Sequence, residues 1–231
     1  MNNSTNITEN HTHIMETTTI LNHDLLNTEE QSIDNMNILQ RLIKRFGDIV
    51  CSFFGLIILS PVFAIIAIKQ KMSSEGPIFF KQERIGKNGK PFNIIKFRTM
   101  VVDAEDDGPA LAKDGDDRLT KFGKFLREHH LDELPQLWNV LVGDMSLVGY
   151  RPERQFYIDQ IMQRNPDYQL LYCSRPGVTS YATVYNGYTD TIEKMLTRLD
   201  MDLEYLRKRT LLLDIRIIFQ TVFQVGKGEK I

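Results

Sequence analysis

The longest apolar stretch of the chain covers residues 49–68, which are 20 residues without a formal charge. A straight helix of this length just spans the hydrocarbon core of a bilayer, which is about 30 Å thick. Ser60 and Pro61 lie past the middle of the stretch. A proline at such a position removes a backbone hydrogen bond and bends the helix. The pattern therefore predicts a membrane-embedded helix with a break at the Ser-Pro pair.

Basic residues on both sides of this stretch indicate how it enters the membrane. The flanking residues are Arg41, Lys44, Arg45, Lys69 and Lys71. The positive-inside rule assigns both ends to the cytoplasm, which a helix satisfies only by entering the bilayer and turning back. We therefore predict that residues 38–72 form a basic entry segment and a re-entrant helix–break–helix hairpin, with Ser60 and Pro61 as its hinge. A kinked transmembrane span and a buried core helix are the two alternatives.

The hydrophobic pattern becomes that of a small cytosolic domain over residues 73–231. Residues 77–82 and 92–98 are short apolar runs on either side of a glycine-containing turn, which predicts a β-hairpin. Helical spacing of apolar residues recurs at 119–127, 134–142, 191–213 and 215–225. The predicted fold class is α+β and mainly helical, with the membrane hairpin packed on this domain.

The last predicted helix carries an apolar stripe of Ile215, Ile218, Phe219 and Val222. Such a stripe faces either the protein core or the membrane interface. Packing in the core is the more common outcome, and we expect it here.

Composition separates the first 37 residues from the rest. Residues 1–37 hold six acidic residues and no Lys or Arg, so a net charge of about +4 falls on the remainder of a chain whose total is −2. The segment is rich in Asn, Thr and Glu and lacks aromatic residues, which is typical of a disordered acidic tail. The basic remainder suits an anionic membrane surface and phosphorylated substrates. Two scattered cysteines are too few for a disulfide framework.

The candidate chemistry is concentrated in residues 131–152, where Asp132 and Glu133 are adjacent carboxylates in an otherwise apolar segment. Like charges raise each other's pKa and apolar neighbours desolvate them, unless cations lie close by. Nearby basic residues in the sequence are Lys121, Lys124, Arg127, Arg151 and Arg154. This combination indicates a site where Mg²⁺ and phosphate meet. The alternative is a helix start whose acidic first turn is favoured by the macrodipole.

A carboxylate in such a place can act as a nucleophile. It can attack phosphorus and give an acyl phosphate. Attack on a pyrophosphate requires charge neutralisation of the leaving nucleotide, which Mg²⁺ and arginines provide. Asp132 is the candidate nucleophile on this argument.

Residues 131–152, together with 81–90 and 96–100, resemble the bacterial sugar transferase family, the monotopic phosphoglycosyl transferases. Members of this family move a sugar 1-phosphate from a nucleotide sugar to a polyprenyl phosphate. The similarity runs from about Arg41 to the C-terminus, with several separated motifs in the family's order. It implies the re-entrant hairpin, a cytosolic catalytic domain and UDP as the carrier of the sugar.

The resemblance also implies roles for individual residues in a ping-pong cycle. Asp132 matches the covalent nucleophile and Glu133 its acidic partner, and we expect both to position Mg²⁺. Arg127 matches an arginine that contacts phosphate. Lys96 and Arg98 match the basic pair of the Lys-Phe-Arg motif, and we expect at least one of them to face the diphosphate.

Two further turns are implied as parts of the substrate site. Arg151 and Pro152 match the family's Pro-Arg-Pro turn, which helps to hold the nucleotide, and Arg175 matches a turn that borders the sugar pocket. The chain departs from the family at Tyr150, which replaces the first proline of Pro-Arg-Pro. This change removes the basis for predicting the turn's geometry, although an aromatic ring there can stack on a base.

We therefore predict an enzyme that makes a polyprenyl diphosphate sugar at the cytoplasmic face of the bacterial inner membrane and so initiates glycan assembly. Its expected partners are a UDP-sugar, undecaprenyl phosphate, membrane lipids and Mg²⁺, with no nucleic acid. The oligomeric state is left open, a homo-oligomer included, as are the sugar and the pathway. The alternatives are a membrane-bound phosphatase or pyrophosphatase and a non-catalytic membrane scaffold.

Overall fold

The computed structural model describes residues 33–227 except 106–107, 112–114 and 188. The predicted acidic tail lies outside the described residues up to position 32. Its last residues, 33–37, are described and pack against the rest of the protein. The Asp34 carboxylate is buried and pairs with the guanidinium groups of Arg209 and Arg41. These residues therefore belong to the folded part of the protein, although composition assigned them to the tail.

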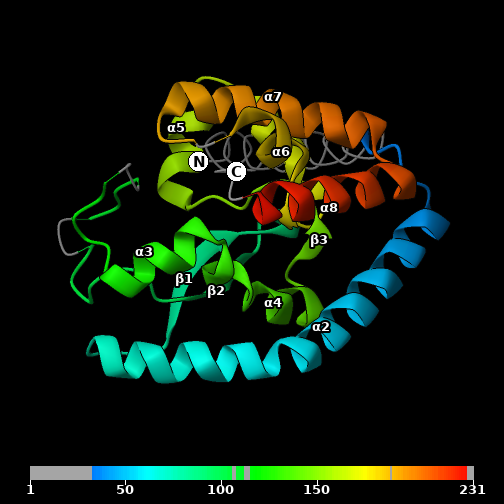
Figure 1. The fold of residues 1–231 in the computed structure, drawn as a ribbon. Coiled ribbons are helices and arrows are strands. Elements are labelled where there is room, and N and C mark those ends of the chain that lie inside the picture. The colour runs from blue at the N-terminus through cyan, green and yellow to red at the C-terminus, as the bar shows by residue number, and fades with distance from the viewer. Residues whose placement is uncertain (1–32, 106–107, 112–114, 188, 228–231) are drawn as a thin grey trace, which may run out of the picture.

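The apolar stretch lies in one long helix, α2 (Ile38–Ser73), which begins at a capping box formed by Asn37 and Gln40. Figure 1 shows that α2 is bent, so that its two halves run along two sides of the remaining structure. Pro61 has no N–H to donate to the carbonyl four residues earlier, at Ile57. The Ser60 hydroxyl donates to that carbonyl instead, at 2.7 Å. The Ser-Pro pair therefore satisfies the backbone group that the bend releases.

Within the described residues, α2 alone is long and apolar enough to cross a membrane. Only 11% of its most apolar window is buried inside the protein. This exposure excludes the alternative of a buried core helix and indicates association with a membrane. The re-entrant path of the helix stays a prediction, because the bend is compatible with more than one placement in a bilayer.

The predicted β-hairpin is confirmed. Strands β1 (Phe79–Ile85) and β2 (Pro91–Phe97) pair antiparallel, with Phe79 opposite Phe97 and Ile85 opposite Pro91. The connecting turn (Lys87–Gly89) places Asn88 and Gly89 at positive φ. Asparagine and glycine tolerate this conformation better than other residues, which accounts for the tight reversal.

The rest of the domain is mostly helical, in agreement with the predicted α+β class. Two short strands, β3 (Ser146–Val148) and β4 (Gly177–Thr179), form a second, parallel pair. In Figure 1 the helices α5, α6 and α7 gather on the side of the molecule away from the second half of α2. The helical elements are α3 (Lys121–Glu128), the 3₁₀ turn η2 (Leu131–Glu133), α4 (Gln136–Val142), α5 (Gln155–Met162), η3 (Pro166–Cys173), α6 (Tyr181–Asn186), α7 (Ile192–Lys208) and α8 (Leu211–Gly226).

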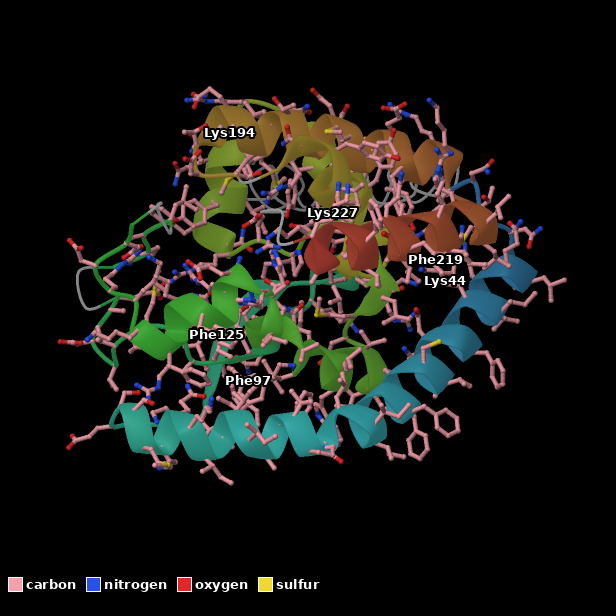
Figure 2. All side chains as sticks on the ribbon, in the orientation of Figure 1. Lys44, Phe97, Phe125, Lys194, Phe219 and Lys227 are labelled. Carbon is pink, nitrogen blue, oxygen red and sulfur yellow. The ribbon has the colours of Figure 1, made fainter. Side chains whose placement is uncertain are left out.

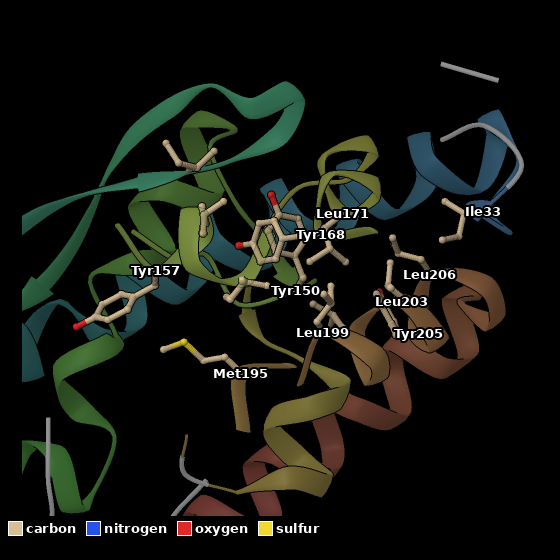
Figure 3. Packing of buried hydrophobic residues seen from close by; sticks show 14 of the residues in the cluster. Ile33, Tyr150, Tyr157, Tyr168, Leu171, Met195, Leu199, Leu203, Tyr205 and Leu206 are labelled. Carbon is tan, nitrogen blue, oxygen red and sulfur yellow. The ribbon is translucent and has the colours of Figure 1, made fainter. Parts of the chain in front are cut away.

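The main hydrophobic core lies between α5, η3 and α7, and Figure 3 shows its packing. Tyr150 is fully buried in this core, near Tyr168 and Leu203. Its ring is therefore unable to stack on a nucleotide base, which corrects the expectation from sequence. No cis peptide bond occurs in the described part of the chain, including the bond before Tyr150.

The expectation for the last helix holds for only one residue of the predicted stripe, Ile218, which packs against the core. In α8 the core position is Ile217, which is fully buried. Ile215, Phe219 and Val222 are 50%, 72% and 65% exposed. Three of the four stripe residues therefore face outward, while Ile218 packs with Ile217 against the core.

Candidate functional site

The acidic pair lies in its own short turn between two helices. Helix α3 ends at Glu128 and is capped by His129, and His130 follows with a φ of 53°, in the left-handed region. This residue reverses the chain into η2, which contains Asp132 and Glu133. Helix α4 begins only at Gln136, so the pair precedes the helix and does not lie in its first turn, which was the alternative interpretation of the sequence.

Glu133 is held by two cations from different parts of the chain. The Lys96 Nζ donates to its carboxylate at 2.5 Å, and an Arg151 Nη atom lies 3.5 Å from the same oxygen. Burial alone would raise the pKa of Glu133. The positive charges of Lys96 and Arg151 outweigh that effect and hold the pKa well below its usual value. Glu133 is therefore ionised throughout the physiological pH range.

Asp132 differs from its neighbour although the two are adjacent. Its side chain is buried, with 6% of the residue exposed. Burial raises the pKa of Asp132 above its ordinary value, and the negative charge of Glu133 adds to this; Lys96 and Arg127 act in the opposite direction. A raised pKa means a more basic carboxylate, and the site thus pairs a permanently ionised acid with a more basic one.

The pair opens onto a cavity of about 1090 Å³. Three predicted cationic residues that line it come from separate elements: β2 supplies Lys96, α3 supplies Arg127, and the segment after β3 supplies Arg151. The structure thus gathers around two carboxylates cationic side chains that lie 24 to 55 residues apart in the sequence. This arrangement suits a ligand with several negative charges, such as a diphosphate.

The comparison with known sequences agrees with this geometry. A profile of the bacterial sugar transferase family matches residues 39–228. The chain belongs to this family. The match includes α2, the β-hairpin and the whole cavity described above.

Several curated relatives of this family member are similar over most of its length. It is 45% identical over 186 residues to the UDP-glucose:undecaprenyl-phosphate glucose-1-phosphate transferase of Escherichia coli (strain K12), covering 80% of this chain and 40% of that protein. It is 39% identical over 186 residues to the UDP-N-acetylgalactosamine-undecaprenyl-phosphate N-acetylgalactosaminephosphotransferase of Aeromonas hydrophila, covering 80% of this chain and 44% of that protein. The exopolysaccharide production protein PSS of Rhizobium leguminosarum bv. phaseoli is 38% identical over 200 residues, covering 81% of this chain and 98% of that protein. The chain thus spans about two fifths of the length of the first two relatives.

In this family member, Arg98 lines the cavity but is largely engaged in structural contacts. Its Nε donates to the Pro77 carbonyl at 2.8 Å, and an Nη atom donates to the Ser74 hydroxyl at 3.0 Å. The carbonyl of Arg98 accepts a hydrogen bond from Gln70 of α2 at 2.6 Å. Arg98 therefore ties the end of α2 to the β-hairpin, and Lys96 is the member of the basic pair that reaches the acids.

Arg175 and Pro152 are not among the residues that line the cavity. The Arg175 Nε donates to the Gly143 carbonyl at 2.8 Å, just past the end of α4. The Pro152 carbonyl accepts a hydrogen bond from Arg84 at 3.1 Å. The structure places both residues in supporting positions around the cavity wall.

Sequence reasoning missed a second charged group on the cavity wall. Glu153 is buried and accepts hydrogen bonds from Arg198 at 2.7 Å and from Arg84 at 3.3 Å. Next to it, Arg154 pairs with Glu105 at 3.0 Å. The residues come from β1, α7 and two loops, so no local spacing signals that they meet.

The two carboxylates of the site suit Mg²⁺ better than they suit a metal ion that is coordinated only by protein side chains. No group of three or more His, Cys, Asp or Glu side chains with metal-binding geometry occurs in the described part of the chain. Mg²⁺ is commonly bound by one or two carboxylates together with waters and substrate phosphates. Asp132 and Glu133 offer that number of ligands, and the cations around Glu133 leave Asp132 as the more available one.

Proposed function

We propose that this chain transfers a sugar 1-phosphate from a UDP-sugar to undecaprenyl phosphate through a covalent aspartyl-phosphosugar intermediate. The observation that carries the proposal is the buried, basic Asp132 beside a Glu133 held by Lys96 and Arg151, at the wall of one large cavity. The names of the E. coli and Aeromonas relatives support the substrate classes, a UDP-sugar and undecaprenyl phosphate.

In the first half-reaction the Asp132 carboxylate attacks the phosphorus that carries the sugar. A bond forms between an Asp132 oxygen and this phosphorus. The bond from the phosphorus to the bridging oxygen breaks, and UMP leaves with that oxygen and its electron pair. Lys96, Arg127 and Arg151 offset the negative charge that collects on the diphosphate.

In the second half-reaction undecaprenyl phosphate takes the place of UMP. One of its phosphate oxygens attacks the same phosphorus, and the bond to Asp132 breaks. The products are undecaprenyl diphosphate sugar and a regenerated carboxylate. Glu133, which stays ionised, keeps Lys96 and Arg151 in place during both steps.

Asp132 and Glu133 would hold Mg²⁺ at this site. When bound, the ion supplies charge neutralisation at the diphosphate and favours departure of UMP. It would also lower the pKa of Asp132 by its positive charge, so that the nucleophile is ionised when the donor is present.

The membrane part of the proposal follows from the chemistry of the acceptor. A very apolar lipid with a charged head must meet a water-soluble nucleotide sugar at the membrane surface. A helix that enters one leaflet at the cytoplasmic face of the bacterial inner membrane and returns holds the cavity at headgroup height. The bend of α2, together with the backbone hydrogen bond that Pro61 removes inside this helix, supports such a path.

The proposed function is tested by incubating the purified protein with a labelled UDP-sugar, Mg²⁺ and undecaprenyl phosphate. We expect release of UMP and transfer of label to the lipid, and loss of both in Asp132→Asn. Asp200→Asn is the matched control, because Asp200 is exposed on α7 away from the cavity. Full turnover by Asp132→Asn would refute the proposed mechanism. Sugar phosphate released into water without the lipid would indicate a phosphatase or pyrophosphatase instead.

A further inference from the structure

The cavity does not end at the acidic pair. Its lining also includes an apolar section, which is made up of aliphatic side chains from α4 and the residues before it, the β3–β4 pair and α8. Six apolar residues line this section: Leu134, Leu137, Leu147, Val178, Ile218 and Val222. The same cavity is therefore lined both by cationic groups, Lys96 and Arg151 among them, and by this aliphatic set.

Helix α8 is fixed in its position by contacts on its other faces. Ile217 packs in the main core, and the Thr221 hydroxyl is hydrogen-bonded to that of Thr179 on β4 at 2.7 Å. Near the start of α8, Asp214 accepts hydrogen bonds from Lys44 at 2.6 Å and from Tyr205 at 2.5 Å. The apolar wall that α8 presents to the cavity is therefore held in a fixed position by these contacts.

The residues of α8 that form this wall are also partly exposed at the protein surface. Val222 lines the cavity and is 65% exposed, and Phe219 next to it is 72% exposed. Figure 2 shows Phe219 on the lower side of α8, the side on which α4 and α2 lie. An apolar group that contacts this aliphatic wall inside the cavity can thus continue outward beside Val222.

We propose that this apolar section binds the first isoprene units of the polyprenyl phosphate, with the phosphate at the cationic groups. This inference rests on the proposed function and extends it to the acceptor. The complementarity is twofold: an anionic head meets Lys96, Arg127 and Arg151, and an uncharged hydrocarbon chain meets the aliphatic wall. A nucleotide sugar has no apolar part of comparable length, so its polar groups would lose hydration in this section.

The test separates the two half-reactions. Val222→Asp places a charge in the apolar section, and we expect it to raise the KM for undecaprenyl phosphate by about tenfold or more. UMP release in the absence of lipid should stay within about twofold, because the donor does not enter this section. Val222→Trp fills the section without a charge and should raise the same KM. The matched control is Ile215→Asp, since Ile215 belongs to the same exposed stripe but does not line the cavity.

A short acceptor in detergent micelles distinguishes binding of the lipid chain in the cavity from contact of α8 with the membrane surface. With geranylgeranyl phosphate in detergent micelles, where no bilayer is present, Val222→Asp should keep its raised KM and Ile215→Asp should behave as the wild type. Equal effects of the two variants, or an effect of Val222→Asp confined to bilayers, would show that α8 contacts only the membrane surface and would overturn the inference. A wild-type protein that releases no UMP would refute the proposed function itself, which is a separate result.

Discussion

The Asp48 carboxylate of α2 accepts a hydrogen bond from the Ser146 hydroxyl of β3 at 2.7 Å. Its other oxygen accepts one from the backbone N–H of Leu147 at 3.1 Å. Asp48 is 5% exposed and directly precedes the apolar stretch of α2. Three residues earlier, Arg45 donates to the carbonyls of Val140 and Leu141 at the end of α4. The basic and acidic residues of this part of α2 thus attach the membrane helix to the domain, and Arg45 is engaged there instead of at lipid headgroups.

Removing the Asp48 carboxylate should destabilise the protein. In Asp48→Ala the Ser146 hydroxyl and the Leu147 N–H lose their partner while they stay buried, so the free energy of unfolding should fall by about 2–4 kcal/mol. Asp48→Asn, which keeps an acceptor oxygen, should lose less. Thermal unfolding in detergent measures the difference, with Asp200→Ala as the exposed helical control. Equal melting temperatures for Asp48→Ala and the control would show that the contact is unimportant.

The pH dependence of UMP release should respond to Lys96. Its positive charge lowers the pKa of both Glu133 and Asp132. In Lys96→Gln both pKa values rise, so the carboxylates ionise only at higher pH and the acid limb of the rate profile moves upward in pH. The rate on the plateau should fall by about 10²-fold, because a cation that stabilises transition-state charge is gone.

Lys121→Gln serves as the control for this shift. Lys121 is exposed at the start of α3 and does not line the cavity. An acid limb that stays at the same pH in Lys96→Gln would contradict the electrostatic role given to Lys96.

Asp132 and Glu133 should have opposite effects on stability. The pKa of Asp132 is raised in the folded state, so the folded protein binds this proton more tightly than the unfolded chain does. Stability then falls as pH rises above the unfolded value of about 3.9, and Asp132→Asn should melt at a higher temperature than the wild type at pH 7. The difference should vanish below about pH 4, where the carboxyl is protonated in both states.

For Glu133 the sign is reversed. Its pKa is lowered in the folded state, so it contributes stability above the unfolded value of about 4.3 and loses it as pH falls. Glu133→Gln should therefore melt at a lower temperature than the wild type at pH 7. Melting curves of the two variants from pH 4 to pH 8 measure both effects. Shifts of the same sign at pH 7 would contradict the electrostatic description of the pair.

The path of α2 through the membrane can be tested by cysteine labelling. In a background with Cys51 and Cys173 replaced by serine, single cysteines at Leu39 and Met72 mark the two ends of the helix, and both positions are exposed. A re-entrant helix predicts that an impermeant thiol reagent reaches both ends from the cytoplasmic side alone. Pro61→Ala restores the missing N–H and should straighten the helix, so that position 72 becomes reachable from the opposite side. Labelling of the two ends from opposite sides in the unmutated helix would establish a transmembrane span.

The features predictable from sequence are those that local pattern determines. The β-hairpin has strand-forming runs around a glycine turn, and α2 has an uninterrupted apolar stretch with a proline. Their outlines follow from the chemistry of neighbouring residues. The adjacency of Asp132 and Glu133 was also visible, since both lie in a single turn.

The features that sequence did not predict depend on distant partners. Tyr150 lies in the core because η3 and α7 cover it, and Arg175 reaches the end of α4 because β4 pairs with β3. Ile217 is the buried position of α8 because the helix packs by its other face, which leaves Val222 at the cavity. No spacing along the chain specifies these neighbours.

The central claim is that Asp132 carries the sugar phosphate on its own side chain. The most direct measurement starts by mixing the protein with a UDP-sugar and Mg²⁺ in the absence of the lipid acceptor. The reaction is quenched in acid, the protein is digested, and the peptide masses are measured by mass spectrometry. We predict that the peptide containing residue 132 gains the mass of one sugar phosphate, that this adduct disappears when undecaprenyl phosphate is added, and that Asp132→Asn shows none. Steady turnover with no adduct, or an adduct on a different residue, would contradict the account.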